Sequence, residues 1–241
     1  SKFQKSTLEN LLKFGGFPEP FLKQKESFSK IWRRERIARV INEDLRDLTY
    51  LKDYNQLELL ADLFPERVGS LLSIKSLAED LEKSPHTISH WIEILSTVYH
   101  CFLISPYGPP KIKAIKKQQK LYLWDWSAIE NIGPRFENLV AGHLLKYCHF
   151  IEDTEGDSME VRFLRDDQGH EIDFVVLKNK KPIWAIECKT GEKKLSSSIE
   201  YFKKRTKIPE FYQVHLGSKS YNQDGTLVLP FTEFCKLKKL V

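Results

Sequence analysis

Two apolar stretches, HEIDFVVL at 170–177 and IWAIECKT at 183–190, decide how the C-terminal half of the chain folds. Each has the length and the branched residues of a β-strand, and each carries charged residues among apolar ones. Successive side chains of a strand point to opposite faces, so Glu187 and Lys189 share one face. Asp173 likewise lies on the face opposite its apolar neighbours. The two strands therefore predict a place where two acids and a lysine meet.

Charged side chains in strands this apolar are costly to bury unless a partner neutralises them. A divalent metal ion is such a partner, because hard cations take carboxylate oxygens as ligands. A third stretch, PRFENL at 134–139, adds an acid one turn into a predicted helix. The sequence thus predicts a metal-dependent phosphodiesterase site with the catalytic residues Asp173, Glu187, Lys189 and Glu137. The expected metal ligands are Asp173, Glu187, Glu137 and the backbone carbonyl of Cys188.

Hydrolysis of a phosphodiester needs charge neutralisation at the phosphoryl group and a deprotonated water molecule. A metal ion between Asp173 and Glu187 supplies both. Lys189, on the same strand face, orients the attacking water, helps to deprotonate it or stabilises the developing negative charge. The structural alternative is an edge strand with a surface contact between Glu187 and Lys189 and an exposed Asp173. Such Glu-x-Lys pairs are common, so the alternative stays open at this point.

Residues 127–241 alternate helices and strands, which predicts a mixed α/β domain with a central sheet. The expected elements are a helix over 133–148, strands near 160–165, 171–178 and 182–189, a polar helix near 196–206, strands near 211–216 and 226–229, and a short terminal helix.

Residues 1–64 are expected to be helical. LENLLKFGGF predicts a helix that ends at Gly15 and Gly16, after which two prolines prevent its continuation. Apolar residues recur at helical spacing from Phe28 to Leu48, and a shorter helix is expected over 56–64.

Residues 65–126 predict a winged helix. A helix in SIKSLAEDLEKS precedes a second helix that begins with Ser84 as its N-cap and Pro85 at its first position. Two short helices joined by a tight polar turn are typical of a helix-turn-helix. A candidate β-hairpin follows, with no acid between Ser96 and Trp124 and with five lysines, Lys111, Lys113, Lys116, Lys117 and Lys120.

A winged helix of this kind can bind DNA through base contacts in the major groove and through phosphate contacts. It can equally be a protein-interaction module, and lysines on a hairpin also discourage edge pairing. The candidate nucleic-acid contacts are His86, Thr87, Ser89 and His90 on the helix and Lys111, Lys113, Lys116 and Lys117 on the hairpin.

The composition is that of a globular protein, with 41% hydrophobic residues and a modest net charge of +5. Four widely separated cysteines form no CxxC pair, which favours free thiols and a reducing, cytoplasmic location. No apolar run reaches membrane-spanning length. The chain begins at Ser1 and its only methionine is Met159, as expected for a processed terminus or a piece of a longer protein.

The acidic motifs resemble the active site of the PD-(D/E)XK nuclease superfamily, whose core carries a helix Glu, a strand Asp and a Glu-x-Lys strand. The chain is also similar to the C-terminal half of a prokaryotic AAA-type ATPase family that carries the domain of unknown function 4143. The segments that carry this resemblance are FGGFPEP at 14–20, KLYLWDWS at 120–127, GPRFENLV at 133–140, GHEIDFVV at 169–176 and IECKTG at 186–191.

The resemblance implies an ATPase lid remnant over 1–64, a winged helix over 65–126 and a restriction-endonuclease-like domain over 127–241. The positions that match the superfamily pattern are Glu137, Asp173, Glu187 and Lys189. The phosphate-binding motif G-x-x-x-x-G-K-[ST] is absent from the sequence, so no ATPase activity is expected of this chain.

The leading expectation is a Mg²⁺- or Mn²⁺-dependent nucleic-acid phosphodiesterase that is normally coupled to an ATPase. DNA is the preferred partner, and the choice between DNA and RNA stays open. The alternative is a non-catalytic DNA-binding or protein-interaction half that regulates such an ATPase. Members of AAA-type families commonly assemble, so a homo-oligomer is a further expectation. Two weaker signals remain. His170, before the acidic strand, is expected to contact a phosphate or to be a loop histidine. Gln213 and the basic run Lys203, Lys204, Arg205 and Lys207 are expected to border a nucleic-acid cleft or to belong to a solvated helix end.

Overall fold

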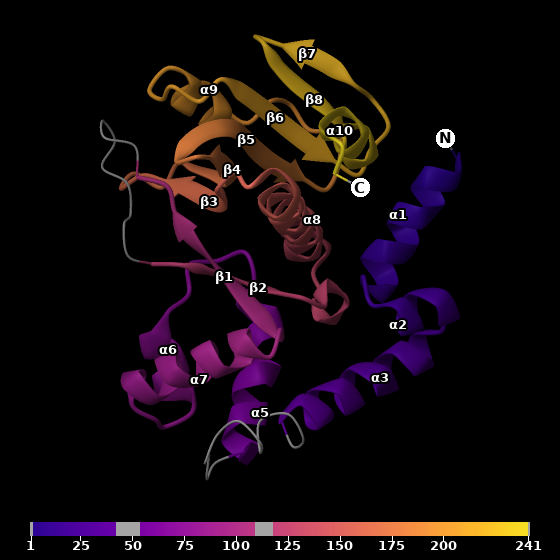
Figure 1. Ribbon diagram of the computed structural model, residues 1–241, viewed down its shortest axis with the longest axis vertical. Coiled ribbons are helices and arrows are strands. Elements are labelled where there is room, and N and C mark those ends of the chain that lie inside the picture. The colour runs from indigo at the N-terminus through magenta and orange to yellow at the C-terminus, as the bar shows by residue number, and fades with distance from the viewer. Residues whose placement is uncertain (1, 42–53, 109–117, 241) are drawn as a thin grey trace. The chain divides into compact units, whose positions relative to one another are not determined.

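The computed structural model describes residues 2–41, 54–108 and 118–240 of the chain (Figure 1). The chain divides into two compact units. The first unit comprises Ser1–Leu103 and Lys120–Arg135, and the second comprises Ile104–Gln119 and Phe136–Val241. The first unit therefore contains the helices of both predicted N-terminal regions, and residues 104–119 of the predicted winged helix belong to the second unit.

The first unit begins with three helices, α1 (Lys2–Phe14), α2 (Pro18–Lys23) and α3 (Glu26–Arg39). As the sequence predicts, α1 ends at Gly15, whose φ of 82° lies in the left-handed region that glycine adopts without strain. The helix expected from Phe28 to Leu48 corresponds to α3, which starts two residues earlier. The last part of that expectation, with Leu45 and Leu48, lies outside the described residues.

The middle elements follow the order that the sequence predicts for a winged helix. They are α5 (Tyr54–Leu63), the 3₁₀ turn η2 (Phe64–Glu66), α6 (Ile74–Asp80), α7 (Pro85–Thr97), β1 (Cys101–Pro106) and β2 (Lys120–Leu123). Both predicted helix starts have a side-chain cap. Ser73 Oγ accepts the N–H of Ser76 at 3.2 Å, and Ser84 Oγ accepts the N–H of Thr87 at 3.0 Å.

The lysine-rich arm of the hairpin is only partly described. Lys111, Lys113, Lys116 and Lys117 lie outside the described residues, so their expected phosphate contacts stay predictions. Lys120 is different from what the sequence suggested, since it is only 1% exposed in β2 and forms a bridge with Leu71. A lysine this deeply buried cannot contact the phosphates of a nucleic acid. Lys120 is therefore not part of the basic surface that the sequence predicts for the arm.

The second unit is built on a mixed sheet. Its strands are β3 (Met159–Arg165), β4 (Glu171–Lys178), β5 (Lys181–Lys189), β6 (Glu210–His215), β7 (Tyr221–Gln223) and β8 (Thr226–Pro230), in the order β3-β4-β5-β6-β8-β7. The end of β1 pairs with β3 in parallel, β3, β4 and β5 are antiparallel, and β5, β6 and β8 run parallel. This sheet confirms the predicted α/β class.

Helices cover both faces of this sheet. On one face, Trp184 of β5 contacts Tyr147 of α8 (Ile132–Glu155), with ring centroids 5.3 Å apart. Trp184 also contacts Phe234 of α10 (Phe231–Lys238) on the same face. Figure 1 shows α8 and α10 together in front of the strands.

The other face carries α9 (Ser197–Lys203). Ala185 follows Trp184 in sequence, and Phe211 precedes Tyr212, whose ring also contacts Phe234 of α10. Ala185 and Phe211 pack with Ile199 and Phe202 in one buried apolar cluster. Because faces alternate along a strand, the odd-numbered residues of β5 and β6 belong to this α9 face.

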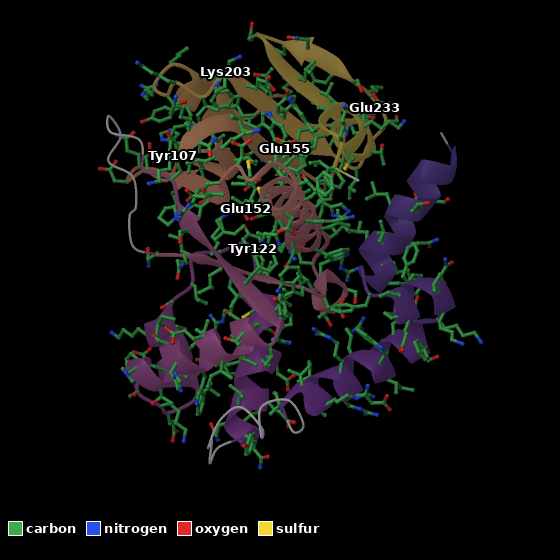
Figure 2. All side chains as sticks on the ribbon, viewed as in Figure 1. Tyr107, Tyr122, Glu152, Glu155, Lys203 and Glu233 are labelled. Atoms are coloured by element: carbon green, nitrogen blue, oxygen red, sulfur yellow. The ribbon has the colours of Figure 1, made fainter. Side chains whose placement is uncertain are left out.

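Two elements of the second unit differ from the expectation. Helix α8 continues to Glu155, where two acids fasten its last turns. Glu152 Oε1 accepts the N–H of Met159 at 3.0 Å, and Glu155 pairs with Lys178 at 3.1 Å (both acids are labelled in Figure 2). Strand β7 was not expected, because its three residues are all exposed and give no alternation of apolar and polar side chains.

Candidate active site

The predicted acids meet where β4 and β5 stop pairing through their backbones. The ladder between the two strands runs from Lys178 and Lys181 to Phe174 and Ile186. At the preceding residue of β4, the carboxylate of Asp173 replaces the backbone as hydrogen-bond partner of β5. Its Oδ2 accepts the backbone N–H of Cys188 at 2.7 Å. The side chain of Asp173 is thereby fixed beside the Glu-x-Lys segment of β5.

Glu187 is buried, with 6% of its surface exposed. Its Oε1 accepts hydrogen bonds from Lys189 Nζ at 2.7 Å and from Ser196 Oγ at 3.3 Å. Its Oε2 is also buried, but it has no hydrogen-bond partner. A buried carboxylate oxygen without a partner is costly, so either a proton or a bound cation would stabilise this atom.

The charges of the site act on one another. Burial, together with the negative charge of Asp173, raises the pKa of Glu187 to about 8. Burial alone would lower the pKa of Lys189, but the charges of Glu187 and Asp173 raise it above its usual value. Lys189 therefore remains an ammonium ion, and below pH 8 the raised pKa of Glu187 keeps that carboxyl protonated in the metal-free protein.

A loop before α9 supports Glu187 from one side. Ser196 is the N-cap residue of α9, yet its hydroxyl does not cap the helix and donates to Glu187 instead. The loop is held by Gln213, which is fully buried and pairs with Glu187 in the parallel register of β5 and β6. Gln213 Oε1 accepts the N–H of Ser196 at 2.9 Å, and Nε2 donates to the carbonyls of Lys193 and Lys194 at 3.1 and 3.2 Å.

The structural alternative of a surface ion pair on an edge strand is wrong for this chain. Strand β5 has a neighbour on each side, β4 and β6. The side chain of Glu187 is 7% exposed, and that of Lys189 is 29% exposed. Glu187 is therefore an interior carboxylate, and only the lysine reaches the solvent in part.

The residues that the structure brings together are Asp173, Glu187 and Lys189. Glu137 is half-buried on α8, and α8 packs on the sheet face opposite the one that carries Glu187. Within the described part of the chain, no group of three or more His, Cys, Asp or Glu side chains is close enough to hold a metal ion. Ligation by Glu137 and by the carbonyl of Cys188 thus stays a prediction, as does metal ligation by Asp173 and Glu187.

Two supporting residues would have been difficult to assign from the sequence. Gln213 was expected to border a nucleic-acid cleft, but its amide is used entirely inside the fold. Ser196 carries the signature of a helix N-cap, and nothing in the sequence shows that its hydroxyl turns toward an acid 9 residues earlier.

The predicted nucleic-acid residues of α7 have mixed environments. His86 and His90 are exposed. Thr87 Oγ1 hydrogen-bonds with Ser84 Oγ at 2.8 Å, and Ser89 Oγ donates to the carbonyl of Pro85 at 3.0 Å. Two of the four side chains, Thr87 and Ser89, thus form hydrogen bonds within α7 and its N-cap.

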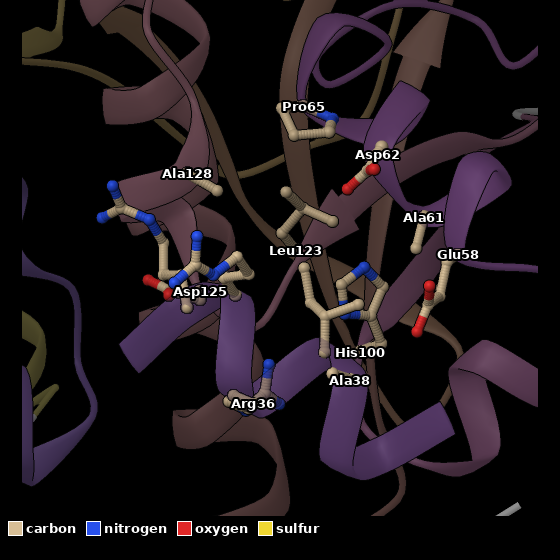
Figure 3. Close-up of a pocket in the computed structure, with 13 residues that line it drawn as sticks. Arg36, Ala38, Glu58, Ala61, Asp62, Pro65, His100, Leu123, Asp125 and Ala128 are labelled. Carbon is tan, nitrogen blue, oxygen red and sulfur yellow. The ribbon is translucent and has the colours of Figure 1, made fainter. Parts of the chain in front are cut away.

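The first unit contains a cavity of about 420 Å³ beside α3 and α5 (Figure 3). Apolar residues such as Ile37 and Leu123 line it together with a buried histidine, His100, whose Nε2 lacks a hydrogen-bond partner. Both signs of charge are present, since the lining includes the arginines Arg33, Arg34 and Arg36 and the acids Glu58, Asp62 and Asp125. This balance favours neither an anion nor a cation, so the acids and the lysine of the second unit remain the candidate active site.

No helix within the described ranges combines the length and the apolar character needed to cross a membrane. A comparison with solved structures gave no significant match. The chain is similar to an uncharacterized protein of Methanocaldococcus jannaschii, MJ1544, with 25% identity over 229 residues. That match covers 90% of this chain and 50% of the relative, so the chain spans about half the length of the curated relative it matches.

Two family models divide the chain at the start of α8. Residues 132–234 match the Domain of unknown function (DUF4143), which confirms that resemblance for the second of the two segments. Residues 5–132 match a different family, so the match to DUF4143 covers the second segment alone. Because residues 5–132 are more than half of its length, the chain belongs to the family described as Domain of unknown function (DUF8612).

Proposed function

We propose that the C-terminal part of this protein is a metal-dependent nucleic-acid phosphodiesterase of the PD-(D/E)XK type. The observation that carries this proposal is the buried, unpartnered Oε2 of Glu187 beside the fixed carboxylate of Asp173. Helix α8, β4 and β5 also supply the helix–strand–strand order that the resemblance implies.

In this proposal Asp173 and Glu187 hold Mg²⁺ or Mn²⁺. When bound, the ion acts as a Lewis acid toward the phosphoryl group and lowers the pKa of water. The N–H of Cys188 keeps Asp173 oriented, and Ser196 does the same for Glu187. Both acids are thus preorganised on a rigid sheet.

Lys189 has a separate role. Its ammonium group lies 2.7 Å from Glu187 Oε1 and is partly exposed, so it can reach a substrate without leaving the site. Its charge stabilises the negative charge that develops on phosphoryl oxygens during hydrolysis. It also donates a hydrogen bond to Glu187 when no substrate is present.

Calorimetric titration of Mn²⁺ into the protein tests the proposal, followed by cleavage assays on single-stranded, nicked and branched DNA. We expect one binding event that Asp173→Asn and Glu187→Gln abolish. Lys189→Met should keep the binding event and lower cleavage by about 100-fold or more. Glu200→Gln, which changes an exposed acid on α9, is the matched control and should behave as wild type. Wild-type protein that binds no metal, even with oligonucleotide present, would overturn the proposal.

A second candidate is a non-catalytic half that regulates an AAA-type ATPase. Its support is the match to DUF4143 and the half of the relative's length that lies outside the similarity. In this case Glu187→Gln and Lys189→Met leave the biological output unchanged. Substitution of the exposed His86 and His90 on α7 abolishes it, as expected for an interaction surface.

A further inference from the structure

Four side chains form a connected cluster at the start of β4 and along α9, next to the proposed active site. They are Asp166, His170, Tyr201 and Arg205. Of these four, only His170 was named by itself as a candidate from the sequence, and Arg205 was named only within a basic run. The cluster lies on the α9 side of the sheet, because Tyr201 belongs to α9 and packs against its buried apolar cluster.

Asp166 anchors this cluster. It is 2% exposed, and its Oδ1 accepts the N–H groups of Gln168 at 3.0 Å and His170 at 2.8 Å. Its Oδ2 accepts from Nδ1 of His170 at 3.0 Å, and its carboxylate also accepts the hydroxyl of Tyr201. The imidazole ring of His170 is therefore held in one orientation by a buried acid.

The rings form a layered stack. The rings of His170 and Tyr201 are 3.8 Å apart and nearly parallel, with an interplanar angle of 8°. The guanidinium carbon of Arg205 also lies 3.8 Å from the centre of the Tyr201 ring. Two groups at this distance cannot share one face of a ring, so Arg205 and His170 cover opposite faces of Tyr201.

This arrangement leaves one ring face at the end of the stack. The side chain of His170 is 34% exposed. Among the residues that the structure describes, no aromatic ring or cation other than Tyr201 stacks on His170. The exposed part of the imidazole is therefore available for a planar group from solution to stack on.

The stack is close to the two carboxylates. His170 precedes Asp173 by three residues, which is about 10 Å along an extended strand. The N–H of Glu171, between them, donates to Ser198 of α9 at 3.4 Å. Ser196, at the start of the same helix, contacts Glu187. One strand and one helix thus join the stack to the proposed site.

The surroundings of α9 are basic. Exposed cations lie before the helix, at Lys193 and Lys194, and after it, at Lys204, Arg205 and Lys207. Lys203 is not among them, because its ammonium group donates to Thr226 Oγ1 at 3.1 Å (Lys203 is labelled in Figure 2). Exposed cations near a planar platform suit a nucleic-acid backbone, whose phosphates are bound electrostatically and without sequence preference.

We propose that His170 is a base-stacking residue and that the substrate of the proposed phosphodiesterase is single-stranded nucleic acid. This inference rests on the proposed function for its substrate role, although the binding can be measured without catalysis. Bases inside a duplex have both faces covered by neighbouring bases. Only an unpaired base offers a free face to an aromatic ring of the protein.

The test is fluorescence anisotropy with a labelled oligo-dT and with a duplex of mixed sequence, in EDTA so that no cleavage occurs. His170→Ala should weaken oligo-dT binding about tenfold, the loss typical of one stacked base, and should leave duplex binding unchanged. His170→Phe retains a ring and should bind oligo-dT within about twofold of wild type. Phe150→Ala, which removes an exposed aromatic ring from α8, is the matched control and should have no effect.

Three outcomes would overturn the inference. The first is that wild type does not bind oligo-dT, and the second is that His170→Ala weakens duplex binding as much as oligo-dT binding. The third is that His170→Phe unfolds at the wild-type temperature but does not restore the affinity for oligo-dT. Asp173→Asn separates the two proposals, because it should abolish cleavage and keep oligo-dT binding. If wild type binds oligo-dT through His170 but cleaves nothing, the proposed function fails and the stacking site stands. If wild type cleaves and His170→Ala binds normally, the stacking site fails alone.

Discussion

Asp173 and Cys188 meet across two strands whose backbones no longer pair with each other. The N–H of Cys188 donates to the side chain of Asp173 at 2.7 Å, one step beyond the last pair of the β4–β5 ladder. The carboxylate therefore replaces a backbone partner and is held at the place where the strands separate. This bond connects the fold to the chemistry of the site, since the same strand end carries Glu187 and Lys189.

Glu187→Gln should change how the stability of the metal-free protein depends on pH. The pKa of Glu187 is about 8 in the folded protein and 4.5 in the unfolded chain. Below pH 4.5 both states are protonated. As the pH rises toward 8 the unfolded chain loses its proton first, so the free energy of unfolding falls by on the order of a few kcal/mol.

Urea unfolding in EDTA at pH 6, 7 and 8.5 measures this effect. Glu187→Gln is neutral at every pH and should remove most of the decline. Glu200→Gln is the control and should keep it. A decline of the same size in Glu187→Gln and wild type would contradict a raised pKa for Glu187.

Gln213→Leu should destabilise the loop that supports Glu187. The substitution removes the side-chain partner of the Ser196 N–H and of the Lys194 carbonyl, while the Lys193 carbonyl keeps the hydroxyl of Tyr221. We expect a loss of about 2–4 kcal/mol in the free energy of unfolding. Hydrogen exchange of the Ser196 amide should become at least about tenfold faster, since a loss of about 1.4 kcal/mol already gives that factor.

The control for this change is Gln168→Leu, because Gln168 is exposed and only its backbone takes part in the Asp166 turn. Its stability should stay within about 0.5 kcal/mol of wild type. Unchanged exchange of the Ser196 amide in Gln213→Leu would show that the loop is held by other contacts.

His100 should make the first unit sensitive to acid. Burial, together with the charge of Arg36, lowers the pKa of His100 to about 4. As the pH falls from 6.5 toward 4, the unfolded chain takes up a proton that the folded protein excludes. The free energy of unfolding therefore drops by about 3 kcal/mol over this window, and above pH 6.5 the contribution is complete.

Unfolding monitored by tryptophan fluorescence at pH 7 and pH 4.5 tests this prediction. His100→Gln should reduce the difference between the two pH values, while His86→Gln on the exposed face of α7 should leave it unchanged. If His86→Gln reduces the difference as much as His100→Gln does, the buried histidine is not its source.

Gly15→Ala should disrupt the end of α1. Gly15 has a φ of 82°, and an added Cβ would lie 2.5 Å from Oδ1 of Asp125. Asp125 is buried and is held by the N–H and hydroxyl of Ser127, so it cannot easily move away. We expect a loss of about 2–4 kcal/mol, which combines the strain of the positive φ with the close contact.

Gly156→Ala separates these two causes. Gly156 has a similar φ of 74°, but no atom lies within 4 Å of an added Cβ. Its loss should be about 1 kcal/mol, from backbone strain alone. Equal losses at the two positions in thermal unfolding would show that the contact with Asp125 contributes nothing.

Much of the fold could be predicted because its signals are local. Alternation predicted β4 and β5, and Ser84 with Pro85 predicted the start of α7. Elements without such signals were missed. Strand β7 is an example, because its exposed residues form a strand only by pairing with the edge of β8. Lys120 shows the reverse error, since a lysine suggests a solvated arm and its burial depends on the partners around β2.

The candidate site divides in the same way. The sequence by itself determined that Glu187 and Lys189 share a strand face and that Asp173 lies on the neighbouring strand, because side chains alternate along every strand. Only the tertiary structure decided that Glu187 is buried, that one of its oxygens has no partner, and that Gln213 and Ser196 support it. Burial and long-range hydrogen bonds depend on which segments pack together, and a residue's own neighbours in sequence do not specify this.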